Sequence, residues 1–525
     1  MKIRKIIYVV VAVLLFSACS KDGENNNSTG DKKWVSFKVA LPSGSPGSRS
    51  VDGLAAGTEY TGTNDEKKIT SVRVVLYAND QVAYAFDLTA SADGSAPIAG
   101  ADVSTASAAT ATYFVSKGRE VLSQSYKMAV FVNPTSAMLS ATAETHALTE
   151  LETAAASISA ATFVTANGIM MSNAQGLINV TTADLYADEA NAENSPVPVA
   201  VDRAVAKVFV NVPAAGITVL NGASGDAVVA SSIVWALDIT NKKSFYIRKQ
   251  APALTANGTI STAAPKAAET IGSSAVLRYS RYAEDPNWIG FAALPAGHAT
   301  LLNEFNYYDE TNATFNGLGW DDADGRYVLE NTMNDVDQWE VETTRVLVKM
   351  NYVPNGITAA TNWLGYKGYI FTTAAFHVSA ETAITETFAG NLAEIVGLPA
   401  GFKADMATLY TTNSGTLAAV YDPAIFNALM TAAFEMNNLR FYLGGMSYYN
   451  VLIRHFDDTQ QPMKMQYGRY GVVRNNIYKV ELSSVRGPGT PTVVPPDGPD
   501  DKDTGYLSAE ISVLPWIVRV QSVNL

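Results

Sequence analysis

Apolar and polar residues alternate most clearly at the end of the chain, over residues 506–525. In the first part of this segment every second residue is apolar, and serine or glutamate lies between. A period of two predicts a half-buried β-strand. Beyond Pro515 the alternation shifts by one position, so we expect two shorter strands that meet at this proline. The main apolar positions of the predicted strand are Leu507, Ile511, Val513, Trp516, Val518 and Val520.

A stretch rich in proline and aspartate, residues 487–505, separates this strand from the rest of the chain. Such a composition cannot bury enough apolar surface to fold, so we expect an extended, semi-rigid linker. An apolar strand on a tether is an aggregation hazard unless another surface receives it. The segment 506–525 therefore predicts a partner that accepts a strand.

A second alternating segment lies near the start of the chain. Its apolar positions are Val35, Phe37, Val39 and Leu41. The pattern predicts a strand over residues 35–41. The loop that follows is rich in proline, glycine and serine and contains Arg49, and loops of this kind are where proteases cut.

The pattern between the two ends predicts a mainly β protein. Further strands are expected over residues 72–77, 127–133, 199–212, 234–239, 344–352, 369–373 and 476–482. Amphipathic spacing predicts a short helix over 146–157 and a longer one over 423–438. With 525 residues the chain exceeds one core, and a stretch rich in Ala, Thr and Pro begins near residue 250. We therefore predict two antiparallel β-sandwich domains, residues 50–250 and 251–486.

The single cysteine, Cys19, predicts a cellular location. Basic residues and a short apolar run precede it, and the run ends in small residues up to Ala18. The run is too short to span a bilayer, so residues 1–18 are interpreted as a secretion signal. Small residues directly before a cysteine are typical of bacterial lipoproteins, which predicts cleavage between Ala18 and Cys19 and lipidation of Cys19. No thiol then remains for a disulfide, and packing alone must stabilise the fold.

Charge and motifs exclude several classes of function. The net charge of −13 argues against nucleic acid as a partner, which needs a basic surface. The histidines lack metal-site spacing, and no nucleophile elbow or nucleotide-binding loop occurs. Residues 320–325 resemble a calcium loop, but Trp320 stands where its first aspartate belongs, which favours a polar turn. Tyr448 and Tyr449 could stack on sugars, although such residues more often pack beside a sheet. We predict no enzyme activity, no cofactor and no metal.

The two alternating end segments together suggest assembly. If the early strand completes the first sandwich, a cut between Arg49 and Ser50 removes a lipidated propeptide, residues 19–49, and opens an apolar groove. The strand 506–525 of a neighbouring copy can fill that groove, and each buried Val, Leu, Ile or Trp then contributes about 1.5–3 kcal/mol. At ~3.3 Å per residue the segment spans ~60 Å, enough to run along both domains of an acceptor. A head-to-tail contact of this kind does not close, so it yields a filament.

Four short motifs add a family resemblance. They are IMMSN at residues 169–173, VDRAVAKV at 201–208, VVRNNIY at 472–478 and VLPW at 513–516. With the lipoprotein signal and Arg49, they resemble the Bacteroidetes fimbrillins, most closely the stalk subunit of short (minor) fimbriae. Residues 20–24 resemble the acidic signal that sends Bacteroidetes lipoproteins to the cell surface.

The resemblance implies two tandem transthyretin-like β-sandwich domains with a few helices and a tethered C-terminal donor strand. It implies a lipidated precursor at the cell outer membrane, cut by an arginine-specific protease, and then an adhesive extracellular fimbrium formed by strand exchange. The expected partners are identical subunits head to tail, other fimbrial anchor and tip subunits, and host or bacterial surface receptors.

Two alternatives stay open on the sequence alone. A tip or accessory fimbrial subunit ends the filament and needs no donor strand, so the segment 506–525 argues against it. A non-polymerising surface lipoprotein that binds glycans would keep Cys19 and the early strand, and its last residues would pack on its own domain. The mature N-terminus separates the hypotheses, because Ser50 favours polymerisation and lipidated Cys19 favours the glycan binder.

Overall fold

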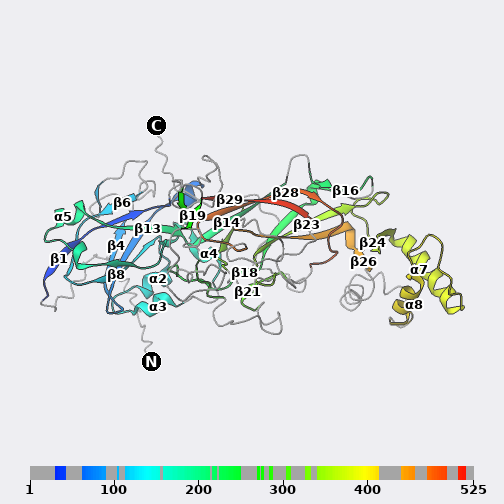
Figure 1. Ribbon diagram of the computed structural model, residues 1–525, viewed down its shortest axis with the longest axis horizontal. Coiled ribbons are helices and arrows are strands. Elements are labelled where there is room, and N and C mark those ends of the chain that lie inside the picture. The colour runs from blue at the N-terminus through cyan, green and yellow to red at the C-terminus, as the bar shows by residue number, and fades with distance from the viewer. Residues whose placement is uncertain are drawn as a thin grey trace, which may run out of the picture.

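The computed structural model describes residues 30–42, 62–89, 103–105, 113–153, 158–212, 216–220, 224–249, 269–271, 274–276, 283–287, 303–308, 325–332, 340–412, 415, 439–455, 470–493 and 507–515. These residues form an elongated molecule in which two β-rich regions follow one another, with a pair of helices at one end (Figure 1). The predicted class, a mainly β protein with a few helices, is confirmed. Within the same residues, no helix has both the length and the apolar character to cross a membrane.

The first region is built on one nine-stranded sheet. In spatial order its strands are β4 (Gln81–Thr89), β3 (Ser71–Ala78), β8 (Tyr126–Val132), β11 (Met171–Asn173), β13 (Val197–Arg203), β2 (Phe37–Ala40), β6 (Tyr113–Ser116) and β5 (Val103–Thr105), and β12 (Ile178–Val180) pairs with β8. Strand β1 (Lys32–Val35) pairs separately with β7 (Arg119–Leu122). The sheet folds over on itself, because the ring of Phe37 in β2 lies 6.1 Å from that of Phe86 in β4. A single core fills the space between the two halves.

Short helices and strand pairs complete the first region. They are α1 (Asn64–Lys67), α2 (Ser136–Ala141), α3 (Leu148–Glu152), α4 (Ala160–Phe163), α5 (Glu189–Asn194), the 3-10 helix η1 (Thr182–Asp184) and the pair β9 (Val164–Thr165) with β10 (Gly168–Ile169). The helix predicted over 146–157 corresponds to α3, whose Leu148 and Leu151 are buried.

The second region is a sandwich of two sheets around its own core. One sheet contains β15 (Thr218–Val219), β28 (Asn476–Val485), β14 (Val205–Asn211) and β22 (Arg326–Leu329), with β29 (Leu507–Pro515) paired to β28. The other contains β16 (Ala227–Val228), β23 (Arg345–Val353) and β17 (Val234–Asp238), with β27 (Met446–Leu452) paired to β23. Smaller elements are β18 (Thr240–Asn241) with β21 (Phe305–Asn306), β19 (Glu269–Ile271) with β20 (Ser274–Val276), and the 3-10 helices η2 (Ala230–Ser232) and η4 (Leu443–Gly445).

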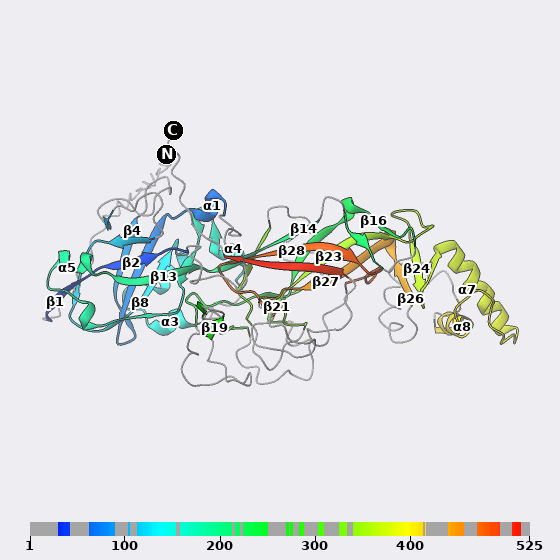
Figure 2. The same ribbon diagram turned by 45° about the horizontal axis from the view of Figure 1, so that its top comes forward.

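A small α/β unit forms the distal end of the molecule (Figure 2). Its sheet contains β25 (Tyr369–Thr372), β24 (Trp363–Tyr366) and β26 (Leu439–Tyr442), beside α7 (Thr373–Phe388) and α8 (Phe402–Thr412). Phe376, Ala380, Ala383 and Ile384 bury one side of α7, and the Thr372 side chain caps its first turn. The strand predicted over 369–373 corresponds to β25, whereas α7, α8 and the other two strands were not predicted, and the helix predicted over 423–438 lies outside the described residues.

The change from the first region to the second falls at Ala204, not near residue 250. Strand β13 ends at Arg203 in the first sheet, and β14 starts at Val205 and pairs with β28 and β22 of the second. The predicted boundary is therefore wrong. The apolar run over 199–212 is continuous, and periodicity shows that a segment is a strand but not which sheet receives it.

Candidate assembly site

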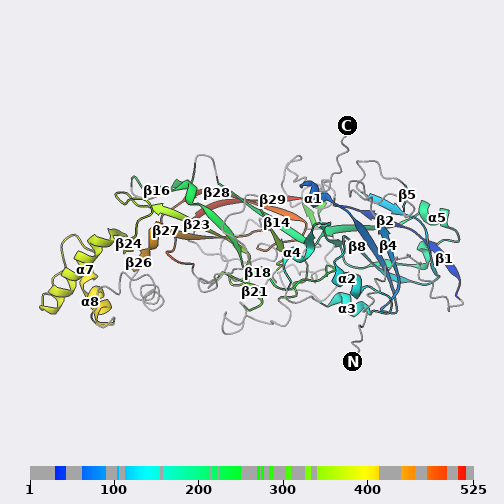
Figure 3. The ribbon, with the colours of Figure 1, turned by 180° about the vertical axis from the view of Figure 1, so that it is seen from behind.

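Strand β2 lies inside the first sheet rather than at its edge, as Figure 3 shows from behind. It pairs in parallel with β13, where Phe37 lies opposite Val197. It pairs antiparallel with β6, where Ala40 lies opposite Tyr113. Because β13 and β6 both form their ladders with β2, removing this strand would leave a slot between two unpaired edges.

The apolar residues predicted for the early strand all lie in the first core. Val35, Phe37 and Val39 are completely buried and Leu41 is 1 % exposed. Burial of such side chains contributes about 1.5–3 kcal/mol each. This segment therefore supplies a substantial part of the first core.

The early segment forms two strands, not the single predicted one. The break lies at Ser36, whose hydroxyl donates to the Ser116 carbonyl at 2.7 Å, while the Phe37 amide donates to the Ser116 hydroxyl at 3.0 Å. On one side of the break β1 pairs with β7, and on the other β2 pairs with β13 and β6. The buried side chains keep their alternation across the break, so the sequence pattern alone does not reveal it.

Strand β29 pairs antiparallel with β28 of the same chain. Leu507 lies opposite Val485, Ile511 opposite Val480 and Val513 opposite Tyr478. The prediction of a terminal strand held apart from its own domain is therefore wrong for the single chain, because the edge of β28 offers it an unpaired ladder. The strand ends at Pro515 as described. Residues Trp516, Val518 and Val520 lie outside the described part of the chain.

The pairing of β29 with β28 contains two irregularities. The register shifts between Leu482 and Ser484, and further along Glu510 lies opposite Glu481. A bulge interrupts the ladder, and like charges at directly opposed positions destabilise a strand pair. Own-chain pairing of the terminal strand is thus weaker than that of an ideal ladder of the same length.

The predicted linker is anchored at its start. Gly487, Gly489 and Pro491 are buried, and Thr490 forms a bridge with Tyr448 of β27. The expectation of a spacer from residue 487 onward is therefore wrong up to Val493. Residues 494–506 lie outside the described part.

Two of the quoted motifs meet where the regions join, although more than 250 positions separate them. The Asn475 amide nitrogen donates to Asp202 at 3.2 Å, and Arg203 donates to the Asn475 side-chain oxygen at 3.1 Å. The backbone of Asn475 adds a bond to the Val205 carbonyl at 2.9 Å. These contacts cross the place where β13 gives way to β14.

Glu330 lies between two arginines at this junction. Its carboxylate accepts from Arg248 Nη2 at 2.8 Å and from Arg474 Nε at 2.7 Å, and all three side chains are buried. Burial by itself raises the pKa of Glu330, but the charges of Arg248 and Arg474 outweigh it and hold that pKa below its usual value. The Glu330 carboxyl group is therefore ionised at neutral pH.

Another buried ion pair joins the second region to the first. Lys207 of β14 donates to Glu66 of α1 at 2.7 Å, and the Tyr327 hydroxyl donates to the same carboxylate at 2.7 Å. Burial raises the pKa of Glu66, but the bonds from Lys207 and Tyr327 outweigh it and lower the pKa. The regions are thus held together by charged groups that have little access to water.

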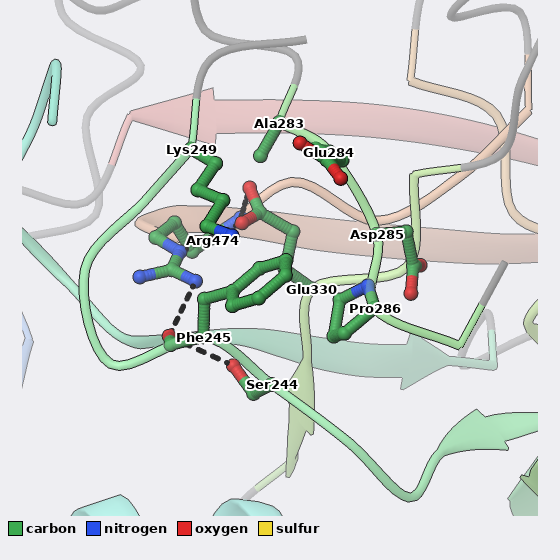
Figure 4. Close-up of a pocket in the computed structure, with 9 residues that line it drawn as sticks. All are labelled: Ser244, Phe245, Lys249, Ala283, Glu284, Asp285, Pro286, Glu330 and Arg474. Carbon is green, nitrogen blue, oxygen red and sulfur yellow. Dashed lines mark hydrogen bonds and ion pairs between the residues drawn. The ribbon is translucent and has the colours of Figure 1, made fainter. Parts of the chain in front are cut away.

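The cavity beside this junction is too small for an organic ligand (Figure 4). Its volume is about 10 Å³, the space of one water molecule, and Phe245, Asp285, Glu330 and Arg474 are among its lining residues. Burial raises the pKa of Asp285 to about 6, although the Asn287 and Asn241 amides donate to its carboxylate.

Several predicted residues lie outside the described part: Ala18, Cys19, Arg49, Ser50 and Trp320. Within the described residues no group of three or more His, Cys, Asp or Glu could hold a metal ion. Tyr449 is only 3 % exposed and belongs to the second core, so it packs beside the sheet rather than presenting a surface to sugars.

Comparison with protein families gives two matches at opposite ends of the chain. Residues 35–203 match the family "Major fimbrial subunit protein (FimA)". Residues 440–522 match "Major fimbrial subunit protein type IV, Fimbrillin, C-terminal". The first match begins at Val35 and ends at Arg203, so it includes β2 and stops where the first region ends.

Solved structures give distant similarities. A putative cell adhesion protein from Parabacteroides distasonis is 13% identical, with 93% of this chain and 100% of that one covered and a TM-score of 0.40. A fimbrilin (fimA) from Porphyromonas gingivalis is 15% identical, with 92% and 98% covered and a TM-score of 0.40. The tip fimbrial protein Mfa3 from the same species is 11% identical, with 93% and 100% covered and a TM-score of 0.32. No curated protein matches the sequence significantly.

The two family matches define a class, the structural subunits of cell-surface fimbriae, which are not enzymes. Residues 35–203 and 440–522 are thus similar to major fimbrial subunit proteins of the fimbrillin type. The resemblance drawn from the motifs is thereby confirmed at the level of the family.

Proposed function

We propose that this chain is the repeating stalk subunit of a fimbrium, of the kind found in short fimbriae, and that it polymerises head to tail by strand exchange. The observation that carries the proposal is the place of β2, an interior strand whose Phe37 and Val39 are completely buried. An interior strand on a removable segment can leave a slot that only another strand fills well.

The order of events follows from the positions of the segments. Lipidation at Cys19 holds the precursor at the outer membrane surface, with β2 completing the first region. An arginine-specific protease then cuts between Arg49 and Ser50. The cut separates β1 and β2 from the rest of the chain, so their loss frees the subunit from the membrane and opens the slot.

The incoming strand is the terminal segment of a neighbouring subunit, with Leu507, Ile511, Val513, Trp516, Val518 and Val520 as its apolar positions. Before assembly this segment covers the edge of β28 in its own subunit. Exchange then replaces a weak edge pairing by burial in an interior slot, where several side chains contribute about 1.5–3 kcal/mol each. Other fimbrial subunits anchor and end the filament, which supports adhesion to host or bacterial surfaces.

One observation favours a second candidate function. The pairing of β29 with β28 of the same chain is also the arrangement expected of a lipoprotein that stays anchored, keeps β2 and binds glycans without polymerising. A tip subunit is less consistent with the chain, because a subunit that ends the filament has no acceptor for its terminal strand.

Two variants test the proposal. Deleting residues 506–525 should abolish heat-resistant oligomer ladders while monomer still reaches the cell surface, and Arg49→Ala should leave unpolymerised precursor on the membrane. Mass mapping of the mature protein should find Ser50 at the N-terminus. Unchanged ladders from the deletion, or a mature protein that retains lipidated Cys19, would rule out polymerisation by this strand in favour of the anchored protein.

A further inference from the structure

The start of the linker is fixed to the distal end of the second region by two tyrosines. The hydroxyl of Tyr449 donates to the Gly487 carbonyl at 2.9 Å, and that of Tyr442 donates to the Gly489 carbonyl at 2.9 Å. Tyr442 is 1 % exposed and Tyr449 3 %. A buried phenol that loses its acceptor costs about 1–3 kcal/mol, so each bond resists opening.

A backbone bridge reinforces the two tyrosine contacts. The Tyr448 amide donates to the Thr490 carbonyl at 2.9 Å, and the Thr490 amide returns a bond to the Tyr448 carbonyl at 3.0 Å. The Thr490 hydroxyl also donates to the Thr492 carbonyl at 2.7 Å. We call residues 487–490, with Tyr442, Tyr448 and Tyr449, the linker clamp.

The clamp requires a glycine at its centre. A Cβ atom on Gly489 would lie 2.2 Å from the Tyr448 carbonyl oxygen, far inside van der Waals contact. The tyrosine on the other side cannot move aside, because the ring of Tyr442 stacks on that of Trp363 with centroids 3.8 Å apart. The linker is thus seated in a closely fitted site, unlike a freely hanging tether.

We propose that the linker clamp stays closed during strand exchange, so that residues up to Val493 remain with their own subunit and only the chain beyond them moves. The inference rests on the proposed exchange of the terminal strand. Residues 494–506 extend at most about 45 Å when fully stretched. The slot of the neighbour must therefore lie within that distance of Val493.

The clamp also gives the filament a direction. It follows the end of β28, and Tyr442 of β26, a strand of the distal α/β unit, donates a hydrogen bond to it. In the single chain the tail folds back from the clamp along β28, with Leu507 opposite Val485 and Pro515 opposite Asn476. In the proposed exchange the released tail would instead extend past the distal end, which lies opposite the first region along the long axis (Figure 1). The first region of the next subunit should accordingly dock beside the distal unit.

Two engineered disulfides test the proposal: one locks the linker clamp, and the other locks β29 onto β28. Tyr448→Cys with Thr490→Cys would close the clamp covalently, and Lys479→Cys with Ser512→Cys would tie β29 to β28. Both pairs are opposed across antiparallel strands, where Cα atoms lie about 4.5–5.5 Å apart, within the range that a disulfide spans. Each full-length variant is oxidised, and a cooperative unfolding transition shows that it is folded. Trypsin then cuts the propeptide, and the formation of oligomer ladders is compared with that of the reduced protein.

The proposal expects the oxidised clamp variant to form ladders as the reduced protein does, while the oxidised β28–β29 variant forms none until it is reduced. Loss of ladders in both oxidised variants would overturn the clamp proposal alone, because exchange would then need the linker to open. Ladders from the oxidised β28–β29 variant would instead contradict strand exchange itself. If Tyr448→Cys prevents folding, Gly489→Ala serves as a second variant. It should expose the Arg486–Gly487 bond to trypsin in the monomer, whereas the wild-type bond should resist trypsin equally in monomer and polymer.

Discussion

The two ends of the chain form strands in opposite situations. Strand β2 lies inside the first sheet, paired on both sides, and its apolar residues are buried in a core. Strand β29 pairs only with β28 among the described strands, through a ladder with a register shift and opposed glutamates. Releasing β29 breaks one imperfect ladder, with β28. Removing β2 breaks two ladders, with β13 and β6, and also exposes the side of the core that β2 covers.

That difference supplies a driving force in one direction. In the proposed assembly, proteolysis separates β2 from the chain, which leaves the first region without an interior strand while the second region holds the more easily released strand. Under this proposal, moving a terminal strand from an edge into the slot of another subunit lowers the free energy of the two subunits together. The proposed exchange requires that β2 is costly to lose and that β29 is released easily. Phe37→Ala and Glu510→Lys test this contrast, and the other variants test the stability of the second region and its junction.

The largest effect is expected from Phe37→Ala. Truncating this completely buried ring should destabilise the precursor by about 3–5 kcal/mol. The assembled polymer should be unaffected, because the strand that carries residue 37 is gone. Urea unfolding of the precursor and heat dissociation of the polymer measure the two quantities. Phe131→Ala is the matched control, because Phe131 is equally buried in β8 and remains in the mature chain, so it should weaken both forms.

Glu330→Gln tests whether the buried charges next to the junction stabilise the fold. The substitution keeps the shape but removes the only carboxylate in contact with Arg474 among the described ion pairs and leaves Arg248 with Asp202 alone, 3.6 Å away, which should cost about 3–5 kcal/mol in urea unfolding. Glu120→Gln is the control, because it removes an exposed pair with Lys32 and should cost less than about 1 kcal/mol. Equal losses of stability in the two variants would contradict a stabilising role of the buried charges at the junction.

The second region should respond to acid through two buried groups with opposite signs. Burial lowers the pKa of His455 to about 3, below its usual 6.5, so the stability from its neutral form is complete above 6.5 and is lost as pH falls toward 3. Burial raises the pKa of Asp285 to about 6, above its usual 3.8, so its contribution declines as pH rises from 3.8 to 6.

Single substitutions should separate these contributions. Compared with the wild type, His455→Gln should lose less stability between pH 6.5 and 4, and Asp285→Asn should lose more. Each difference should be at most about 1.4 kcal/mol per pH unit, measured by urea unfolding across this range. Parallel profiles for all three proteins would contradict the assignment.

The smallest effect is expected from Glu510→Lys. A lysine opposite Glu481 replaces like charges by an opposite pair, which should strengthen the pairing of β29 with β28 by about 0.2–1 kcal/mol. Polymerisation after proteolysis should become slower, as followed by the rate of ladder formation. Glu510→Gln should give an intermediate rate, and a faster rate for the lysine variant would argue against release of β29 as a step.

Sequence patterns predicted strands well where alternation runs along one ladder. The expected strands over 344–352 and 476–482 correspond to β23 and β28, and the family motifs identified the correct family. The break at Ser36 was not predictable, because it depends on Ser116, which is distant in the sequence. The change of region at Ala204 was not predictable either, because it depends on the pairing of β14 with β22 and β28, which are distant in the sequence.

Helix α7 and the start of the linker do have recognisable sequence patterns. The residues Phe376, Ala380, Ala383 and Ile384 recur at helical spacing and could have indicated α7. Gly487 and Gly489 interrupt a proline-rich stretch whose composition suggested only a spacer, and their role depends on tyrosines contributed by β26 and β27. Of the predicted site, the apolar residues of the early segment are buried in the first core, while the terminal strand pairs with β28 of its own chain.

The most direct test joins one strand of the slot to the terminal strand of another subunit. One chain carries Ala200→Cys, on the part of β13 that pairs with β2, and a second chain carries a single cysteine at position 513, 516 or 518. The chains are mixed, cut between Arg49 and Ser50 and oxidised, and cross-linked peptides are identified by mass spectrometry. The account predicts a disulfide between different chains, in polymers only and for at least one position. Filaments that form without any such cross-link would contradict it.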